Sequence, residues 1–431
     1  MSTLKVNKLR DTAGSTDAIV LDPNGGAVLA GVTTISTARI TTGITTSIQV
    51  GGGVTISESG IEATGVGITC ANINGGQISG RRNKVINGAM MVSQRNGDSA
   101  VQLSASEQYI VDRFKNDTGS SFNMKADASQ STDSPDGFSN SLKLACDGVS
   151  TPSGGDNGLI VTFIEGQDLQ DLAFGTSNAK PLTLSFYAKS ASQNNGHVYG
   201  VQLGAYLNGS RNSQTKGFTI TSSWQRFVMT FDATGTVTST PILNNNSFGM
   251  MVGFCLGVGP DDLVNYATWT ADTGLKGFTG QDNFFDNTSN EIYITGVQLE
   301  VGSQATAFEH RSFGEELALC QRYFYVHSEG DSTSIGNGTY WTSNTVFCPV
   351  HFPVTMRVAP SLTVANDGST NYYGWYRNGG ANSEKGDNWI IGVAGVQGCE
   401  IYDPAASGTA GHSCFGRHTN ANGKITFNSE L

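Results

Sequence analysis

Apolar and polar residues alternate with a period of two through the central part of the chain. In the segment 181–190, Leu182, Leu184, Phe186 and Ala188 occupy every second position. This alternation is typical of a β-strand that buries one face. The other clear segments of this kind are 158–166, 197–207, 224–231, 248–259 and 290–301. With the shorter runs around them, at least seven strands are available between residues 85 and 311, which predicts a jelly-roll β-sandwich of two packed sheets.

The last hundred residues also have a β pattern, but they are richer in Gly, Asn and aromatic residues. Strand-like segments lie at 344–356, 361–366, 389–396 and 424–428. Residues 327–431 are therefore predicted to form a small distal β domain.

The amino-terminal part consists almost entirely of Gly, Thr, Ser, Ile and Val. After an anchoring segment at 1–27, residues 28–84 place a β-branched residue every two to five positions, with glycines between them. Such strands are too short to build a core in one chain, but three copies wound together would share one apolar axis. We therefore predict an intertwined β shaft and an elongated homotrimer. A flexible low-complexity linker is the alternative interpretation.

A short helix is predicted between the two β regions, at 312–326. Ser312 followed by Glu315 is a capping box. The residues at helical spacing after it form one apolar stripe, which we expect to face the same stripe of two other copies around a threefold axis. The stripe consists of Phe313, Leu317, Cys320 and Phe324.

The same stretch gathers Glu309, His310, Arg311 and Cys320 in a few turns of chain. A Cys–His nucleophile pair would need the two side chains to converge from different elements, and no third orienting residue is evident. We therefore interpret the stretch as a structural joint.

Composition supports an all-β protein and narrows its partners. The chain has 55 Gly among 431 residues, only 14% charged residues and a net charge of −11. Nucleic acid needs clustered Lys and Arg, so it is not an expected partner. No apolar run approaches the roughly 20 residues of a membrane helix, and no signal-peptide core follows Met1. The seven scattered cysteines lack any C-x-x-C, which indicates buried thiols in a reducing cytoplasm.

One segment of the distal domain combines flat aromatic rings with hydrogen-bonding groups on a Gly-rich backbone, which suits a sugar. The predicted receptor-binding residues are Asn371, Tyr372, Tyr373, Trp375, Tyr376, Arg377 and Trp389. The alternative, equally open, is a strand whose aromatic residues alternate between the core and a neighbouring subunit.

The chemistry of a metal centre or an enzyme is not predicted. Cys399, His412, Cys414 and His418 lack a close pair of ligands, so no metal or other cofactor is expected. The acids that a glycosidase would need are interpreted as turn residues, and no nucleotide-binding or hydrolase motif is present. These acids are Glu384, Asp387, Glu400 and Asp403.

Several stretches carry a resemblance to a known family. The run "GVQLEVGSQATAFEHRSFGEELALCQRYF" at 296–324 resembles the segment that ends the jelly-roll domain of many tailed-bacteriophage tail fibre proteins. The stretches 83–97, 109–114 and 352–364 agree with it, and residues 1–34 are similar to the start of fibre proteins from phages of marine cyanobacteria.

This resemblance implies a homotrimeric virion fibre assembled in the host cytoplasm. Its amino terminus would bind a tail adaptor or nozzle protein, and its carboxy terminus a host surface polysaccharide. The resemblance is weakest from about residue 365 onward. A purely structural appendage and a glycan-degrading tailspike are the alternatives in function.

Overall fold

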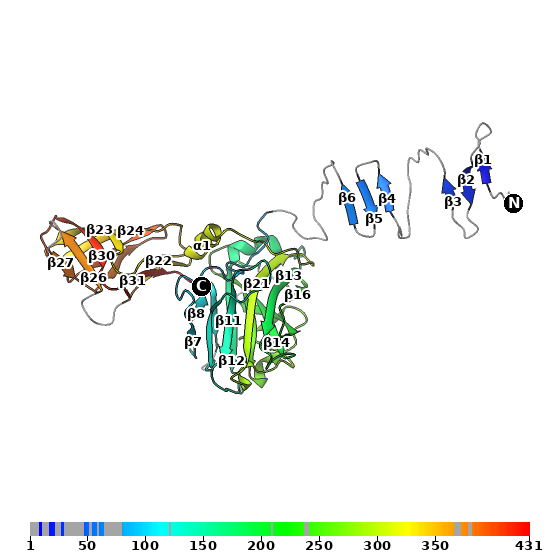
Figure 1. Ribbon diagram of the computed structural model, residues 1–431, viewed down its shortest axis with the longest axis horizontal. Coiled ribbons are helices and arrows are strands. Elements are labelled where there is room, and N and C mark those ends of the chain that lie inside the picture. Colours follow the sequence, from blue (N-terminus) through cyan, green and yellow to red (C-terminus); the bar gives the residue numbers. More distant parts are fainter. Residues whose placement is uncertain are drawn as a thin grey trace. The chain divides into compact units, whose positions relative to one another are not determined.

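The chain divides into two compact units, Met1–Cys70 and Ala71–Leu431, which are described separately. Figure 1 shows the computed structural model and its elements. It describes residues 80–431 apart from 120–121, 208–209, 237–240, 366–371 and 378–381, with backbone only at 382–385. Before residue 80 it describes the backbone of six strands.

The described strands of the first unit form two antiparallel meanders of three strands each. One contains β1 (Lys8–Arg10), β2 (Asp17–Leu21) and β3 (Ala27–Leu29), and the other contains β4 (Ser47–Val50), β5 (Val54–Ser57) and β6 (Gly60–Ala63).

In the second meander Ile48 lies opposite Ile56, and Ile56 lies opposite Ile61. Residues directly opposite each other share a face of a sheet, so this register gathers the β-branched residues into one row. The rest of the predicted shaft lies outside the described residues, and its sharing among three copies stays a prediction.

A β-sandwich forms the first part of the second unit, as predicted. One sheet has six strands in the order β16-β13-β21-β11-β10-β7, and the other has seven in the order β19-β15-β14-β17-β12-β9-β8. The bounds are β7 (Val101–Leu103), β8 (Tyr109–Val111), β9 (Phe114–Asp117), β10 (Ala126–Ser131), β11 (Ser141–Cys146), β12 (Asn157–Glu165), β13 (Leu182–Ser190), β14 (Val198–Leu207), β15 (Ser210–Thr219), β16 (Gln225–Phe231), β17 (Phe248–Val258), β19 (Thr270–Asp272) and β21 (Glu291–Val301).

The alternation seen in the sequence decides which side chains fill this sandwich. Leu182, Leu184 and Phe186 on β13 are fully buried, and they belong to one large apolar cluster between the sheets. Three short 3-10 helices, Gly166–Leu172, Pro260–Asp262 and Phe284–Asp286, and the strand pair β18 (Leu263–Val264) and β20 (Gly277–Phe278) complete this part.

The distal part is also β, with its own core. A seven-stranded sheet has the order β27-β26-β30-β23-β24-β29-β28, and a three-stranded sheet has the order β22-β31-β25. Their bounds are β22 (Phe324–Glu329), β23 (Ser334–Thr342), β24 (Thr345–His351), β25 (Ser361–Val364), β26 (Tyr373–Arg377), β27 (Asn382–Lys385), β28 (Ile390–Ala394), β29 (Gly398–Asp403), β30 (Ser413–His418) and β31 (Lys424–Asn428). We call the seven-stranded sheet the distal sheet.

The predicted capping box is confirmed, but the helix is shorter than predicted. Helix α1 spans Phe313–Gln321, and Ser312 Oγ accepts the Glu315 N–H while the Glu315 carboxylate accepts the Ser312 N–H. Phe324 starts strand β22, which pairs with β31 at the far end of the chain. That long-range pairing overrides the helical spacing, so the prediction of helix to residue 326 was wrong.

The predicted stripe is also divided. Cys320 and Phe324 are buried within one chain, and Cys320 packs against Ile86 and Tyr323. Their side chains are already covered, so they do not face other copies as predicted. Leu317 is partly buried at the edge of the same cluster, whereas Phe313 is 54% exposed and is the most accessible residue of the stripe.

Candidate functional site

Four of the predicted receptor-binding residues, all of them aromatic, lie inside the distal core. Tyr372, Tyr373, Trp375 and Trp389 are between 1% and 7% exposed. The rings of Trp375 and Trp389 are 4.7 Å apart, and the Tyr373 hydroxyl donates to the Ala365 carbonyl at 2.6 Å. Rings in these positions cannot stack on a sugar, so this part of the site prediction was wrong.

The packing around Trp375 explains why its strand turns this ring inward. Glycines of the two strands nearby, Gly338 on β23 and Gly416 on β30, leave room for the indole. A Cβ atom at either position would lie 2.9 or 3.2 Å from Cζ3 of Trp375. The indole Nε1 also points at the buried carboxylate of Asp403, at 3.4 Å.

The remaining predicted residues are either half-buried or outside the described residues. Tyr376 and Arg377 are half-buried, with the Arg377 guanidinium 5.4 Å from the centre of the Tyr340 ring. Asn371 lies outside the described residues. Of the predicted set, Tyr376 therefore remains as an aromatic residue with an accessible ring.

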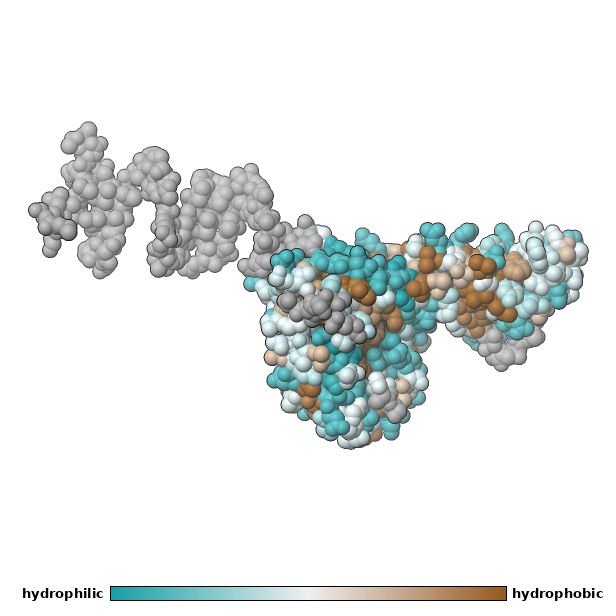
Figure 2. Space-filling model, turned by 180° about the vertical axis from the view of Figure 1, so that it is seen from behind, coloured by the Kyte–Doolittle hydropathy of each residue, from teal (hydrophilic) through white to brown (hydrophobic). Residues whose placement is uncertain are grey.

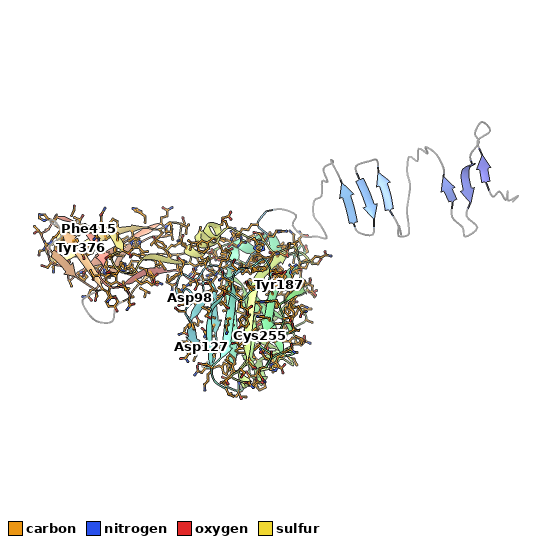
Figure 3. The ribbon with its side chains drawn as sticks, viewed as in Figure 1. Asp98, Asp127, Tyr187, Cys255, Tyr376 and Phe415 are labelled. Atoms are coloured by element: carbon orange, nitrogen blue, oxygen red, sulfur yellow. The ribbon has the colours of Figure 1, made fainter. Side chains whose placement is uncertain are left out.

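The outward side of the distal sheet carries a second set of aromatic residues. On β30 the burial alternates strictly, so Cys414, Gly416 and His418 face inward and Ser413, Phe415 and Arg417 face outward. The rings of Tyr376 on β26 and Phe415 on β30 are stacked, with centroids 5.4 Å apart and planes 9° from parallel. Both residues are labelled in Figure 3, where they lie close together on the distal domain.

A second stacked pair lies on the same side of the sheet, two strands further on. Phe347 on β24 and Tyr402 on β29 are opposite each other in the register, with ring centroids 5.1 Å apart and planes 24° from parallel. Trp341, at the end of β23, is 75% exposed and meets the Phe347 ring edge to face at 6.4 Å. We call these five residues, Trp341, Phe347, Tyr376, Tyr402 and Phe415, the aromatic face.

Polar groups fill the space between the two pairs. Strand β23 separates β30 from β24 and presents Asn337 and Thr339 outward, both exposed. Two strand spacings amount to about 10 Å. The face thus consists of two stacked ring pairs with amide and hydroxyl groups between them.

Apolar surface is also concentrated on the distal part. Among the described residues, half of the exposed large hydrophobic side chains belong to it: Trp341, Ile390, Val393, Val396 and Phe415. Figure 2 shows brown patches on this part of the molecule. An exposed apolar surface framed by polar residues is characteristic of a binding surface.

The electrostatics beneath the sheet are those of a structural core. Burial raises the pKa of the Asp403 carboxyl and lowers the pKa of the His418 and His327 imidazoles. Each has a fixed partner, because Asp403 accepts the Ala405 N–H, His418 Nε2 contacts Ser328 Oγ at 2.8 Å, and His327 Nε2 donates to the Ile335 carbonyl at 2.7 Å.

No metal centre is formed by the described residues. They contain no group of three or more Cys, His, Asp or Glu side chains that could hold an ion. Burial raises the pKa of Cys399 to about 11 and that of Cys348 to about 12, which disfavours the thiolate that binds metal. Cys70 lies outside the described residues, and the other six cysteines are buried thiols.

Among the described side chains, the acids considered for catalysis do not form a pair on one surface. Asp387 accepts the Tyr372 N–H, and Asp403 lies in the core. Glu400 is exposed on β29. The side chain of Glu384 lies outside the described residues.

The stretch around His310 is a structural joint, as predicted. Glu309 Oε2 accepts the N–H groups of Arg82 and Asn83, and Arg311 Nη2 donates to the Asn83 carbonyl at 2.7 Å. His310 packs against the rings of Phe138 and Phe308, 5.1 and 4.9 Å away. Burial raises the pKa of the Cys320 thiol well above its usual value, which opposes a role as nucleophile.

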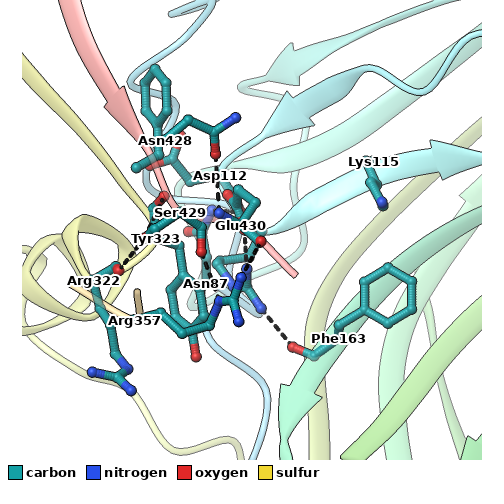
Figure 4. A network of polar contacts seen from close by, with 12 residues as sticks. Asn87, Asp112, Lys115, Phe163, Arg322, Tyr323, Arg357, Asn428, Ser429 and Glu430 are labelled. Carbon is teal, nitrogen blue, oxygen red and sulfur yellow. Dashed lines mark hydrogen bonds and ion pairs between the residues drawn. The ribbon is translucent and has the colours of Figure 1, made fainter. Parts of the chain in front are cut away.

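A polar network extends this joint to the distal domain, as Figure 4 shows. Arg113 of the sandwich forms an ion pair with Glu430, and Ser429 Oγ donates to the Arg322 carbonyl. Arg322 in turn binds both carboxylate oxygens of Glu165, at 2.7 and 2.8 Å. The joint is therefore built from residues that are far apart in sequence.

No family model and no curated protein matches the chain. Solved structures with partial likeness include the CBM22-1 xylan-binding domain from Paenibacillus barcinonensis (7% identity, TM-score 0.25, 49% of this chain and 99% of that one). A family 11 carbohydrate-binding module from Clostridium thermocellum has 12% identity and a TM-score of 0.25 over 49% of this chain and 100% of that one.

A tailspike protein domain of bacteriophage CBA120 has 13% identity and a TM-score of 0.25. The match covers 51% of this chain but only 21% of the tailspike chain. Within the described ranges, no helix is long and apolar enough to cross a membrane.

Proposed function

We propose that the protein is an adhesin whose distal domain binds a surface glycan through the aromatic face. The observation that carries this proposal is the presence of two partly exposed, stacked ring pairs on one side of the distal sheet, with Asn337 and Thr339 between them. A sugar has an apolar C–H face and a rim of hydroxyls, so it is complementary to flat rings beside hydrogen-bonding groups.

The resemblance of 296–324 and the other quoted stretches supports a more specific role, that of a tailed-bacteriophage tail fibre. In this role the amino terminus binds a tail adaptor or nozzle protein, the chain is a homotrimer in the virion, and the distal domain attaches the phage to its host. Trimerisation would also strengthen the overall attachment through individually weak sites, because linking several contacts raises the effective concentration at each one.

The positions of the described acidic residues support binding of the glycan without its cleavage. A glycosidase holds two carboxyl groups on opposite sides of the scissile bond. On the outward side of the distal sheet Glu400 is an exposed acid of β29. Asp387 instead accepts the Tyr372 N–H, and Asp403 is buried in the core. A tailspike-like hydrolase remains a defined outcome of the test below.

The test compares the full-length protein with a double variant, Phe347→Ala with Phe415→Ala, which removes one ring from each stacked pair. Tyr206→Ala is the matched control, because Tyr206 is an exposed aromatic of the sandwich, 38% accessible. Binding is measured to intact host cells and to an array of bacterial surface polysaccharides. The double variant should bind at least tenfold more weakly than the parent, and the control should bind equally.

Unchanged binding by the double variant would show that the aromatic face is not the site. Release of oligosaccharides from a bound polysaccharide would replace the adhesin by an enzyme. Folding is checked by comparing the thermal unfolding of all three proteins, since the substituted rings are not fully buried.

A further inference from the structure

Arg417 is an exposed cation at one end of the aromatic face. It lies on β30 two residues after Phe415, so both side chains project from the same side of the strand. Its guanidinium carbon lies 5.1 Å from the centre of the Phe415 ring and 5.5 Å from the centre of the Tyr376 ring. Such contacts orient a guanidinium along aromatic rings without using its N–H groups.

The N–H groups of Arg417 have no acceptor within the part of the chain that the structure describes. Two other cations of the distal domain are engaged. Arg357 donates to the carbonyls of Ser429 and Glu430, and Lys424 pairs with Glu329 and donates to the Gln94 carbonyl. The contrast indicates that the Arg417 donors are available to a ligand.

The outward side of the distal sheet also carries an acid, but on a different strand from Arg417. Among the described side chains, Glu400 is an exposed acid on this side, and it belongs to β29, three strands away from β30. The Arg417 cation and the Glu400 carboxylate thus belong to opposite ends of the aromatic face.

We propose that the glycan bound by the aromatic face is acidic, and that Arg417 binds the carboxylate of a uronic acid or a similar sugar. This inference rests on the proposed function. A guanidinium presents N–H groups in a fork that matches the two oxygens of a carboxylate, and the charge makes each hydrogen bond stronger. Sugar rings next to the acidic one would stack on Phe415 and Tyr376, and further rings on Phe347 and Tyr402.

Long-range repulsion does not oppose this ligand, although the whole chain has a net charge of −11. At physiological salt, exposed charges more than about 8 Å apart are largely screened. The nearby Arg417 guanidinium therefore decides whether the glycan carboxylate is attracted or repelled. Glu400 repels a carboxylate at the other end, which would fix the direction in which the polysaccharide lies.

The experiment uses the full-length protein and an array of uronate-containing and neutral bacterial polysaccharides. Each acidic polymer is also printed after chemical reduction of its carboxyl groups to alcohols. The variants are Arg417→Gln, Arg417→Lys, and Lys180→Gln as a control that loses the same charge from an exposed position of the sandwich. The parent should bind acidic polymers, and carboxyl reduction should weaken that binding about tenfold or more.

Arg417→Gln should cause a loss of the same size for the intact acidic polymer and no loss for its reduced form. Arg417→Lys should fall between, and Lys180→Gln should match the parent. Equal binding of reduced and intact polymers, or of parent and Arg417→Gln, would overturn the acidic ligand while leaving glycan binding in place. If the parent binds no polysaccharide and no host cell, both proposals fail.

Discussion

Trp375 and Phe415 lie on neighbouring strands of the distal sheet but on opposite sides of it. Trp375 is opposite Gly416 in the register and 1% exposed, whereas Phe415 is opposite Tyr376 and 37% exposed. One side of the sheet thus serves stability and the other is available to a ligand. The two functions can therefore be separated by substitution.

Replacing Trp375 by Ala should unfold the distal domain at lower denaturant concentration. A buried Trp→Ala change removes apolar contacts and leaves a cavity, at a cost of about 3–5 kcal/mol in the free energy of unfolding. Phe415→Ala should cost about 1 kcal/mol or less, because the ring is partly in water. Urea unfolding followed by tryptophan fluorescence measures both. Equal losses of stability would contradict the separation of the two sides.

The sequence predicts the distal strands well but not the side on which each residue lies. In "NYYGWYRN" three of the aromatic residues face the core and Tyr376 does not. Trp375 can face the core because Gly338 and Gly416, which belong to other strands, make room for its ring. A local pattern cannot contain that information. The exposed set could have been found from the alternation around Phe415 and Phe347, where each aromatic residue lies between two residues that are buried.

The joint shows the same limit in another form. Ser312 and Glu315 predict the start of α1 because a capping box is local. The end of the helix depends on the pairing of β22 with β31, about one hundred residues later in the chain. Glu309 and Arg311 also contact the backbone of residues 82–85, and these distant partners could not be identified from spacing.

The buried ion pair of the joint should be sensitive to the loss of one partner. Arg322→Met leaves the Glu165 carboxylate, which is fully buried, with neutral donors alone, the Tyr323 hydroxyl and the Gln167 side-chain amide. Removing one member of a buried pair costs about 3–5 kcal/mol. A second substitution, Glu165→Leu, should restore part of the lost free energy of unfolding, because it removes the unpaired charge. A double variant less stable than Arg322→Met alone would argue against this account.

Mild acid should destabilise the distal domain. Burial lowers the pKa of His418 and of His327, so the unfolded chain binds protons below about pH 6.5 that the folded chain does not. Stability is therefore lost as the pH falls through 6.5 toward the folded pKa values. Asp403 acts in the opposite sense at lower pH, because burial raises its pKa.

The measurement is the midpoint of thermal unfolding at pH 7.5 and at pH 5.5. The parent should unfold at lower temperature at pH 5.5. His418→Asn with His327→Asn should reduce the difference between the two pH values, whatever its effect on stability at pH 7.5. A midpoint that does not change with pH in the parent would exclude these imidazoles as the cause.

Phe313 is the stripe residue available for the predicted trimer. It is 54% exposed on α1, so Phe313→Asp should leave the fold of a single chain intact while weakening association. Sedimentation velocity of the parent should show a trimer, and the variant should dissociate at higher concentration than the parent does. A compact monomer for the parent at all concentrations would remove the trimer from the account.

The proposed function requires that the outward side of the distal sheet contacts the glycan. Hydroxyl-radical footprinting with mass spectrometry tests it directly, with the polysaccharide that the full-length protein binds best on the array. Addition of this polysaccharide should reduce oxidation of Trp341, Phe415 and Tyr402, and it should leave Tyr206 of the sandwich unchanged. Protection confined to the sandwich, with the three distal residues oxidised as before, would contradict the account.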